Sequence, residues 1–524
     1  MHKRLLEIAI LLSIHGAFLV QAQTLDELNR PLLKKGQWDL VLDYKNFGRE
    51  YWGISLDHEE TSSIDSQVIL FPRLAFGLAK NLQLTIDGAW QFPITNAMPQ
   101  FETWDYWRET NTLCLLSAQL RFRPARNLEL GFFWLTGQAK EDVHYARTVG
   151  VDDHIKAVFS GDILILSGTW LSSVDSRSRL LRADLDGLHR PLLKKGHWRI
   201  DPEILIRRHE YHYHSRLDVL PDFIDKNSDS TDVRLRLAAS HGLTDHLQAK
   251  ADIYWQPSSR TRESSRSLIT WWDGTEHADE TETCRLLFGN WGARGSLAWR
   301  PSRPLELSLA IRRNRLKIGY EETNVPFGPD AVIEGGSNSK VIDVSTHIIT
   351  QFEVRATFLS KTKRLGTTLV ADLPGIYQPL LEKRQFKLDG KIDFRSYHCP
   401  TELLQGFYKD SRDTDNWLFR MQGSYGISHS FQFTAYYGIS LSRNLFTGFK
   451  YENEYSLGGE LKWRLKRRAE IYAAFNYRPT EYWDVFPDFI LDIDDYLNEH
   501  HDFMSTYFGE TVNIILGMKL IVGK

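Results

Sequence analysis

The sequence predicts an all-β fold, a single transmembrane up-and-down antiparallel β-barrel of about 18 strands built from three sequence repeats. Three observations lead to this prediction. A ten-residue motif returns along the chain, the expected strands alternate apolar and polar residues, and long and short connections alternate between them.

The first observation is the motif Asn-Arg-Pro-Leu-Leu-Lys-Lys-Gly-Gln-Trp at 29–38. It returns as His-Arg-Pro-Leu-Leu-Lys-Lys-Gly-His-Trp at 189–198 and, more weakly, as Tyr-Gln-Pro-Leu-Leu-Glu-Lys-Arg-Gln-Phe at 377–386. Two further anchors follow each copy in the same order: a Gly-to-Gln segment at 77–83, 242–248 and 426–432, and an Arg-to-Glu segment with the apolar residue that follows it, at 123–130, 300–307 and 464–471. Such self-similarity indicates a repeat architecture. We therefore divide the barrel into repeats at 23–182, 183–370 and 371–524.

The second observation is a period of two. In 38–44, Trp38, Leu40, Leu42 and Tyr44 share one face, while Asp39, Val41 and Asp43 share the other. This spacing fits a strand and not a helix. The same pattern returns at 82–90, 386–394 and 431–437. It fits a lipid-facing apolar side and a wet inner side, but a soluble sandwich with its apolar face inward would give the same alternation.

The third observation concerns the connections. The first repeat offers six strands, at 38–44, 68–76, 82–90, 112–122, 128–135 and 155–170. Tight turns at 79–81 and 123–127 alternate with long polar stretches at 48–66 and 93–111, and 258–283 and 479–503 are further expected long loops. In an up-and-down sheet all the long loops then lie at one end. This asymmetry is typical of outer-membrane barrels, which have short periplasmic turns and longer external loops.

The first residues resemble a secretory signal. Lys3 and Arg4 precede an apolar stretch at 8–20, and a small-residue site precedes Gln23. We therefore predict a signal peptide at 1–22 and an outer-membrane location after its cleavage. An N-terminal membrane anchor is the alternative, although the stretch is short for a span. The formal net charge of −3 argues against a nucleic-acid partner.

The hairpin Gly-Leu-Thr-Asp-His-Leu-Gln at 242–248, downstream of the second motif copy, is similar to hairpins of bacterial outer-membrane β-barrel proteins. It resembles in particular the family linked to phenol meta-cleavage pathways, whose members are regarded as transporters. The resemblance implies that small solutes pass through a barrel that contacts outer-membrane lipid and the outer-membrane assembly machinery. It supplies no catalytic residues. Such barrels usually end in an aromatic residue, whereas this sequence ends Gly523-Lys524.

The expected inner face carries charge of both signs. The predicted pore-lining residues are Asp39, Asp43, Asp87, Arg121, Arg234, Arg236, Lys250, Asp252, Arg294, Arg300, Arg420, Lys462 and Arg464. Facing rows of opposite charge would set a transverse field across a pore and order polar solutes. The same charges could instead pair with one another and fill the lumen, and the sequence leaves both alternatives open.

No enzymatic motif stands out. The sequence contains no Gly-x-Ser-x-Gly elbow, no Gly-rich phosphate loop and no His-Glu-x-x-His. Glu210, His212 and His214 alternate with a spacing that could bind a metal, but a solvated strand end is the simpler interpretation. We therefore expect no enzyme, no cofactor and no metal.

The function predicted from the sequence is a porin-like channel for small polar or aromatic solutes. A structural or assembly-partner barrel without transport is the alternative. A barrel-embedded hydrolase with scattered Ser and His residues is a weaker one.

Overall fold

The computed structural model describes residues 32–54, 60–98, 106–125, 127–146, 152–172, 192–217, 223–270, 276–287, 289–302, 304–326, 340–360, 380–398, 400–403, 410–411, 414–444, 450–466, 469–485 and 504–522. The expected signal peptide at 1–22 lies outside these residues. Among the described residues, no helix is long and apolar enough to cross a membrane.

Strand segments make up nearly all of the described chain. The N-terminal part contains β1 (Trp38–Ile54), β2 (Glu60–Ala79), β3 (Leu82–Met98), β4 (Tyr106–Ala125), β5 (Leu128–Ala146) and β6 (Asp152–Leu171). The central part contains β7 (Trp198–Leu217), β8 (Phe223–Thr244), β9 (Leu247–Gln256), β10 (Ser259–Thr270), β11 (Glu276–Leu287), β12 (Asn290–Ser302), β13 (Leu305–Pro326) and β14 (Lys340–Leu359). The C-terminal part contains β15 (Phe386–His398), β16 (Pro400–Leu403), β17 (Asp410–Ser411), β18 (Thr414–Ser428), β19 (Phe431–Asn444), β20 (Lys450–Lys466), β21 (Ala469–Val485) and β22 (Met504–Val522).

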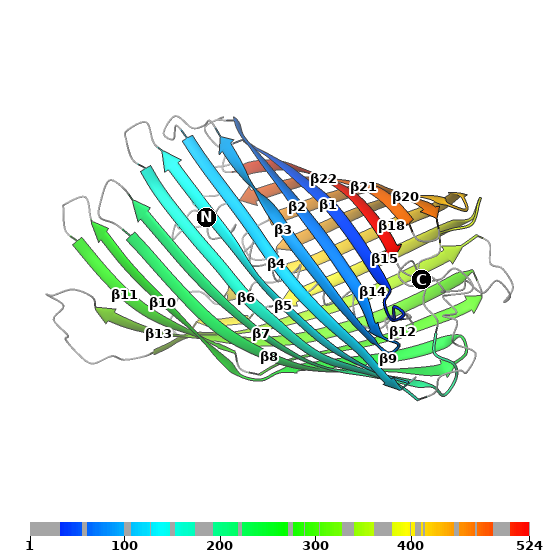
Figure 1. Ribbon diagram of the computed structural model, residues 1–524. Helices are drawn as coiled ribbons and strands as arrows, with labels where there is room; N and C mark the ends of the chain where they lie inside the picture. Colours follow the sequence, from blue (N-terminus) through cyan, green and yellow to red (C-terminus); the bar gives the residue numbers. More distant parts are fainter. Residues whose placement is uncertain are drawn as a thin grey trace.

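The segments form one closed antiparallel ring. β1 is hydrogen-bonded to β2 on one side and to β22 on the other, from Trp38↔Val522 to Ile54↔Thr506. In Figure 1 the blue β1 accordingly lies beside the red β22. Four pairs of segments follow one path each, namely β9 with β10, β11 with β12, β15 with β16 and β17 with β18, so the 22 segments form 18 barrel strands. The predicted barrel of about 18 strands is confirmed.

Two neighbouring barrel strands are interrupted at the same height. The path of β9 and β10 breaks after Gln256, and the path of β11 and β12 breaks before Asn290, which pairs with Gln256. Asn290 is 2% exposed, and its Oδ1 accepts the backbone N–H of Lys317 on β13 at 2.8 Å. Its side chain therefore replaces a ladder hydrogen bond that the interruption removes.

The strands are longer than the sequence pattern suggested. β2 and β4 have 20 residues each, whereas a transmembrane β-strand needs about 9–11. The stretch 258–283, expected to be a long loop, is largely β10 and β11, which pair in unbroken register from Ser259↔Leu287 to Thr270↔Glu276. That prediction is wrong, because beyond the apolar belt both faces of a strand can be polar while the backbone ladder continues.

Burial is inverted relative to a soluble protein. Exposed large apolar side chains occupy alternate positions, for example Leu74, Ile86, Leu120 and Leu516, which are 36–50% exposed. The buried polar side chains occupy the intervening positions on the inner face, among them Thr85, Gln119 and Ser424. A continuous outer apolar surface of this kind fits contact with lipid and not with water. The structure therefore decides between the two alternatives that alternation alone left open.

Each copy of the repeated motif forms the same contact at the end of the barrel that carries the tight turns, here called the short-turn end. In the second copy the backbone N–H of Leu193 donates to Gln248 Oε1 at 2.8 Å, that of Gly196 donates to the Gly242 carbonyl at 2.8 Å, and that of Gly242 donates to the His197 carbonyl at 3.0 Å. We call this arrangement the clasp.

The other two copies reproduce the clasp. Leu33 N–H donates to Gln83 Oε1 at 3.0 Å, and Leu381 N–H donates to Gln432 Oε1 at 2.9 Å. The Gly-to-Gln anchors of the sequence repeat therefore supply the groups that bond to the motif. The clasps support the interpretation that the motif fixes the entry of β1, β7 and β15.

The third clasp contains a strained residue. Gly36 and Gly196 have φ of 78° and 79°, and the equivalent residue of the third copy, Arg384, has φ of 62°. A non-glycine residue in this left-handed region costs about 1–2 kcal/mol. We therefore expect Arg384→Gly to raise the unfolding free energy of the barrel by up to about 1 kcal/mol, whereas Arg384→Lys should leave it unchanged, as measured by urea unfolding in lipid vesicles. A loss of stability in Arg384→Gly would contradict this account.

Candidate functional site: the inner wall

All thirteen predicted pore-lining residues fall on the inner side of the wall, opposite the exposed apolar side chains of their strands. Most of them are joined to partners of opposite charge, in three groups described below. Their role in lining an open pore stays a prediction, because the pairing favours the alternative that charges fill the lumen.

The first group lies at hairpins of the short-turn end. Arg121 Nε donates to Glu129 Oε1 at 3.0 Å, and the Arg121 side chain is buried. Arg300 Nε donates to Glu306 Oε2 at 2.6 Å, and Arg464 Nε donates to Glu470 Oε2 at 3.0 Å. The last two pairs are the ends of the repeated Arg-to-Glu anchors, and Arg123 pairs with Glu129 in the same way. Each of these arginines therefore links the two strands of a hairpin.

The second group lies on β7 to β9, β12 and β20. Arg236 Nε donates to Asp252 Oδ1 at 2.9 Å, and its Nη1 lies 3.5 Å from Glu203. The same Glu203 lies 3.7 Å from Arg234. In looser or more exposed pairs, Arg294 lies 3.6 Å from Glu353 and Lys462 lies 2.8 Å from Glu460.

The third group contains the acidic residues of β1 and β3. Asp39 lies 3.8 Å from Lys519, and Asp43 accepts a hydrogen bond from the Tyr472 hydroxyl. Both contacts cross the seam at which β1 closes the ring with β22. Asp87 lies 3.4 Å from Arg73 and accepts the Ser117 hydroxyl at 3.4 Å.

Two predicted residues differ from the others. Lys250 and Arg420 form no ion pair with any residue that the structure describes. Arg420 is exposed on the inner face, and its neighbours in register are Lys391 on β15 and Gly438 on β19. Neither direct neighbour offers a negative charge, and the nearest acids along β15, Asp389 and Asp393, are paired with Lys387 and Lys391. Arg420 is therefore, with Lys250, one of the two predicted residues whose charge no ion pair compensates among the described residues.

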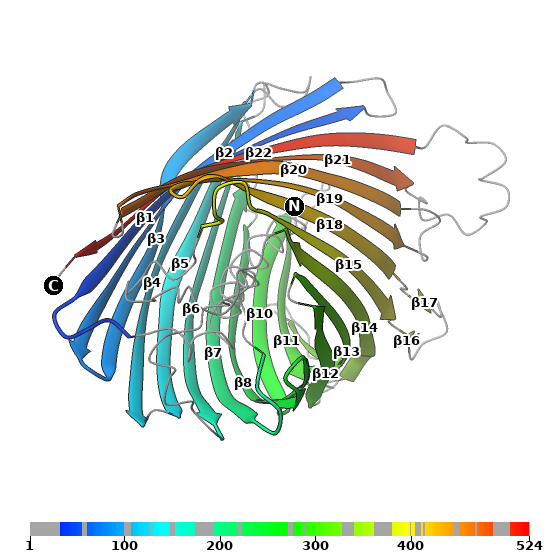
Figure 2. The same ribbon diagram turned by 90° about the vertical axis from the view of Figure 1, so that its right-hand side faces the viewer.

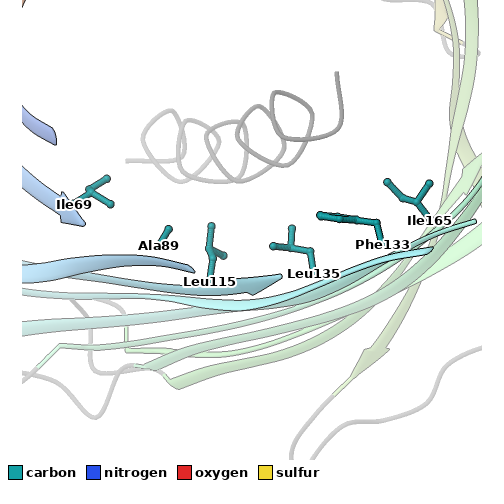
Figure 3. Close-up of a cluster of buried hydrophobic side chains, with 6 residues drawn as sticks. All are labelled: Ile69, Ala89, Leu115, Phe133, Leu135 and Ile165. Carbon is teal, nitrogen blue, oxygen red and sulfur yellow. The ribbon is translucent and has the colours of Figure 1, made fainter. Parts of the chain in front are cut away.

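The inner wall also contains an apolar surface that the sequence analysis missed. Six buried side chains of β2 to β6, drawn in Figure 3, point from the strands into the barrel interior. We call them the inner apolar patch: Ile69, Ala89, Leu115, Phe133, Leu135 and Ile165. Phe71, Leu113, Ile163 and Leu205 pack against its edge.

Register and glycine explain how the patch forms. Phe133 pairs with Ile165, and Leu135 pairs with Ile163, so each apolar residue faces another across the ladder. Gly137 pairs with Leu115, and a Cβ at Gly137 would lie 2.1 Å from Leu115 Cδ2. The absent side chain lets Leu115 lie flat against the wall.

Aromatic rings continue the patch toward the end of the barrel with the long connections, here called the long-loop end. Phe159 and Tyr211 face each other on β6 and β7, with ring centroids 4.5 Å apart. Tyr213 lies two residues further along β7, 6.3 Å from Tyr211, and is 7% exposed. Paired aromatic surfaces of this kind contact other rings favourably.

The opposite side of the wall is ionic. Counted around the ring of 18 barrel strands, nine steps separate β4 from β15 in either direction, and Figure 2 shows the two on opposite sides. On β15, Lys387 lies 3.1 Å from Asp389, and Lys391 lies 3.1 Å from Asp393. We call Lys387, Asp389, Lys391, Asp393 and Arg395 the ionic ladder.

A sequence signal for the inner apolar patch did exist. The runs Val-Ile-Leu-Phe at 68–71, Phe-Phe-Trp-Leu at 132–135 and Ile-Leu-Ile-Leu at 163–166 are apolar at successive positions, not at every second one. A strand that is apolar on both faces has no period of two. These runs therefore indicated apolar residues on the lumen side as well as the lipid side.

Metal binding finds no support in the described part of the chain, which contains no cluster of three or more His, Cys, Asp or Glu residues arranged to hold an ion. His212 instead contacts Asn227 on β8, with Nδ1 2.7 Å from Oδ1. The expected absence of an enzymatic site stays a prediction.

Comparison with known proteins gives a likeness in structure only. No family model matches the sequence, and no curated protein matches it. The chain is similar to the ferric yersiniabactin uptake receptor FyuA of Yersinia pestis, with a TM-score of 0.49 and 8% identity over 94% of this chain and 81% of that chain. It is similar to a FadL homologue of Pseudomonas aeruginosa (TM-score 0.31, 9% identity, 94% and 92% covered) and to the toluene transporter TodX of Pseudomonas putida (TM-score 0.31, 10% identity, 95% and 93% covered). At these values the likeness carries no information on function.

Proposed function

We propose that this chain is an outer-membrane channel for small solutes that combine an apolar or aromatic part with a polar or charged part. The observation that carries the proposal is the two-sided inner wall, with the inner apolar patch opposite the ionic ladder. Barrels of 16–18 strands are wide enough to hold an aqueous channel. The outer apolar surface supports insertion into a membrane, and the outer membrane is where single-chain barrels of this kind are found.

The two sides would act on different parts of a solute. An aromatic or aliphatic group gains about 25 cal/mol for each Å² of apolar surface removed from water at the patch. Fixed charges on the far side create a transverse field that orients the polar group. Weak attraction on both sides favours entry without preventing release.

The first test is single-channel conductance of the purified chain in a planar bilayer. Discrete conductance steps are expected. Their absence in a preparation that migrates as a folded, heat-modifiable barrel would favour the alternative, a structural or assembly-partner barrel.

The second test concerns the solute. Phenylalanine and serine share the same zwitterionic group and differ in the ring, so their relative flux into proteoliposomes reports on the patch. Phe133 and Leu135 are 3% and 7% exposed, so Phe133→Asn with Leu135→Asn removes about 20 Å² of apolar contact, worth about 0.5 kcal/mol, and the preference for phenylalanine should fall roughly twofold. The control is Phe132→Leu, since Phe132 faces outward and is 42% exposed. An unchanged preference in the double variant would contradict a role for the patch.

A third prediction concerns ion selectivity. Arg420→Glu should shift the reversal potential in a salt gradient toward cation preference, because Arg420 has no ion-pair partner among the described residues. Arg420→Lys keeps the charge and should leave the potential unchanged. Arg236 is a poorer choice for charge reversal, since Asp252 and Glu203 both contact it. Identical potentials for wild type and Arg420→Glu would show that no open ion path passes this residue.

A further inference from the structure

A row of cations faces outward on β13. Leu309 and Ile311 are each 46% exposed on the apolar outer face, and Arg313, Arg315 and Lys317 continue the same alternation. The register with β14 is unbroken from Leu305↔Phe358 to Tyr320↔Asp343, so the row does not change face. We call these three residues the outer basic row.

The outer basic row begins where the apolar surface ends. β13 starts at Leu305 at the short-turn end, and Arg313 is its ninth residue. A tilted strand crosses the hydrocarbon layer in about 9–11 residues. Arg313 therefore lies at the edge of the hydrocarbon nearest the long loops, and Arg315 and Lys317 lie at the level of the lipid headgroups.

No acidic residue faces outward directly beside Arg313 or Arg315 on the described parts of the two nearest strands of each side. The outward neighbours in register are Ala293, Trp291, Thr350, Ile348 and Thr346, and beyond them Ile253, Trp255, Ser396 and His398. Within the described part of the chain, Arg313 and Arg315 form no ion pair. By contrast Arg208, which faces outward on β7, lies 2.6 Å from Glu210 and 3.3 Å from Asp229.

The fold does not require these cations. Aligned on the Arg-to-Glu anchors, the equivalent positions are Thr136, Gln138 and Lys140 on β5, and Tyr477, Pro479 and Glu481 on β21. Of these positions only Lys140 shares its residue with the outer basic row, so no other repeat carries three cations there. The outer basic row is therefore a property of one side of the barrel and not of the repeat.

We propose that the outer basic row binds the phosphorylated headgroup of an outer-leaflet glycolipid that carries more than one phosphate. Alternate residues of a strand lie about 6.7 Å apart, so three cations can meet two separate phosphates. Arginine binds phosphate in a bidentate way and is weakly hydrated, which suits a membrane surface. Trp291 pairs with Arg315 in register and is 40% exposed, and its ring lies where barrels place aromatic residues against headgroups.

The test is lipid binding by native mass spectrometry on the full-length folded barrel, with bisphosphorylated lipid A as the probe and its monophosphorylated form and phosphatidylglycerol as comparisons. The wild type should bind the bisphosphorylated form at least tenfold more tightly than does the triple variant Arg313→Gln, Arg315→Gln, Lys317→Gln. Arg313→Lys with Arg315→Lys should retain most of the binding. Lys140→Gln, at the equivalent of Lys317 on β5, is the matched control and should bind as the wild type does.

Equal binding by the wild type and the triple variant would overturn the proposal. Equal binding of phosphatidylglycerol and bisphosphorylated lipid A by the wild type would overturn the assignment to a glycolipid. Heat-modifiable migration establishes that each variant has folded. Conductance is a separate readout, so a barrel that conducts nothing can still bind the lipid, and failure of one proposal leaves the other testable.

Discussion

After Gly242→Ala, most molecules of the protein should fail to fold into a stable barrel. A Cβ there would lie 2.1 Å from the Lys194 carbonyl oxygen and 2.6 Å from that of Leu193. Neither oxygen can move freely, because the clasp holds the motif with several backbone hydrogen bonds. Overpacking costs about 1–3 kcal/mol, and each broken hydrogen bond costs about 1 kcal/mol more, so a loss of roughly 3 kcal/mol or more is expected.

The measurement is urea unfolding in lipid vesicles, together with the heat-modifiable fraction on a gel. Gly295→Ala is the matched control, since a Cβ at Gly295 meets nothing within 4 Å. Gly77→Ala and Gly426→Ala should behave like Gly242→Ala, because their Cβ atoms would lie 2.1 and 2.0 Å from Lys34 and Glu382 carbonyl oxygens. If Gly242→Ala and Gly295→Ala proved equally stable, the clasp would not be a folding determinant.

Arginine should be tolerated at residue 422 and not at residue 421. Met421 is 48% exposed on the outer face, midway along an apolar run of β18 from Trp417 to Ile427. Gln422 is exposed on the inner face. An arginine at the bilayer midplane costs about 2–4 kcal/mol, whereas an arginine in a wet lumen keeps its water. Met421→Arg should therefore lose about that much unfolding free energy, and Gln422→Arg should lose little.

Folding into lipid vesicles, followed by urea titration, gives both values under the same conditions. The two residues are neighbours, so strand position and backbone pairing are matched. Equal losses at the two positions would mean that Met421 does not face lipid.

The architecture could be predicted from the sequence because contact with lipid requires apolar side chains at alternate positions of each strand. Residues such as Trp38, Leu40 and Leu42 alternate because one face of β1 must be apolar, and the tight turns recur because a closed ring of hairpins needs them. The strand ends could not be predicted in this way. In β10, Arg260, Arg262 and Arg266 alternate with Ser259, Thr261 and Ser265 on a strand whose two faces are both polar, so no apolar period marks where it stops.

The side of the wall on which each candidate residue lies could be predicted from the sequence, but the contacts of its side chain could not. Parity placed Arg300 and Arg464 on the inner face, but each is bonded to a glutamate six residues later, across a hairpin. The alternation along a strand cannot reveal that contact, although the same Arg-to-Glu spacing in all three repeats indicated it. The inner apolar patch was overlooked for a different reason. Phe133 and Leu135 interrupt the alternation of apolar and polar residues. The interruption marks a second apolar environment, on the lumen side of the strand.

The length of the strands has a consequence for how a molecule reaches this protein. β8 and β13 have 22 residues each, and a strand inclined at about 45° uses about half of that length to cross the hydrocarbon. The remaining residues, about half of each strand at about 2.3 Å of height each, raise the wall along these two strands by roughly 25 Å beyond the hydrocarbon. On the side formed by β8 and β13 the wall therefore rises well above the membrane surface, whereas β18 and β19, with 15 and 14 residues, rise less. Along β8 and β13, a molecule dissolved among the lipid tails meets only the outer face of the wall, which stands between that molecule and the lumen.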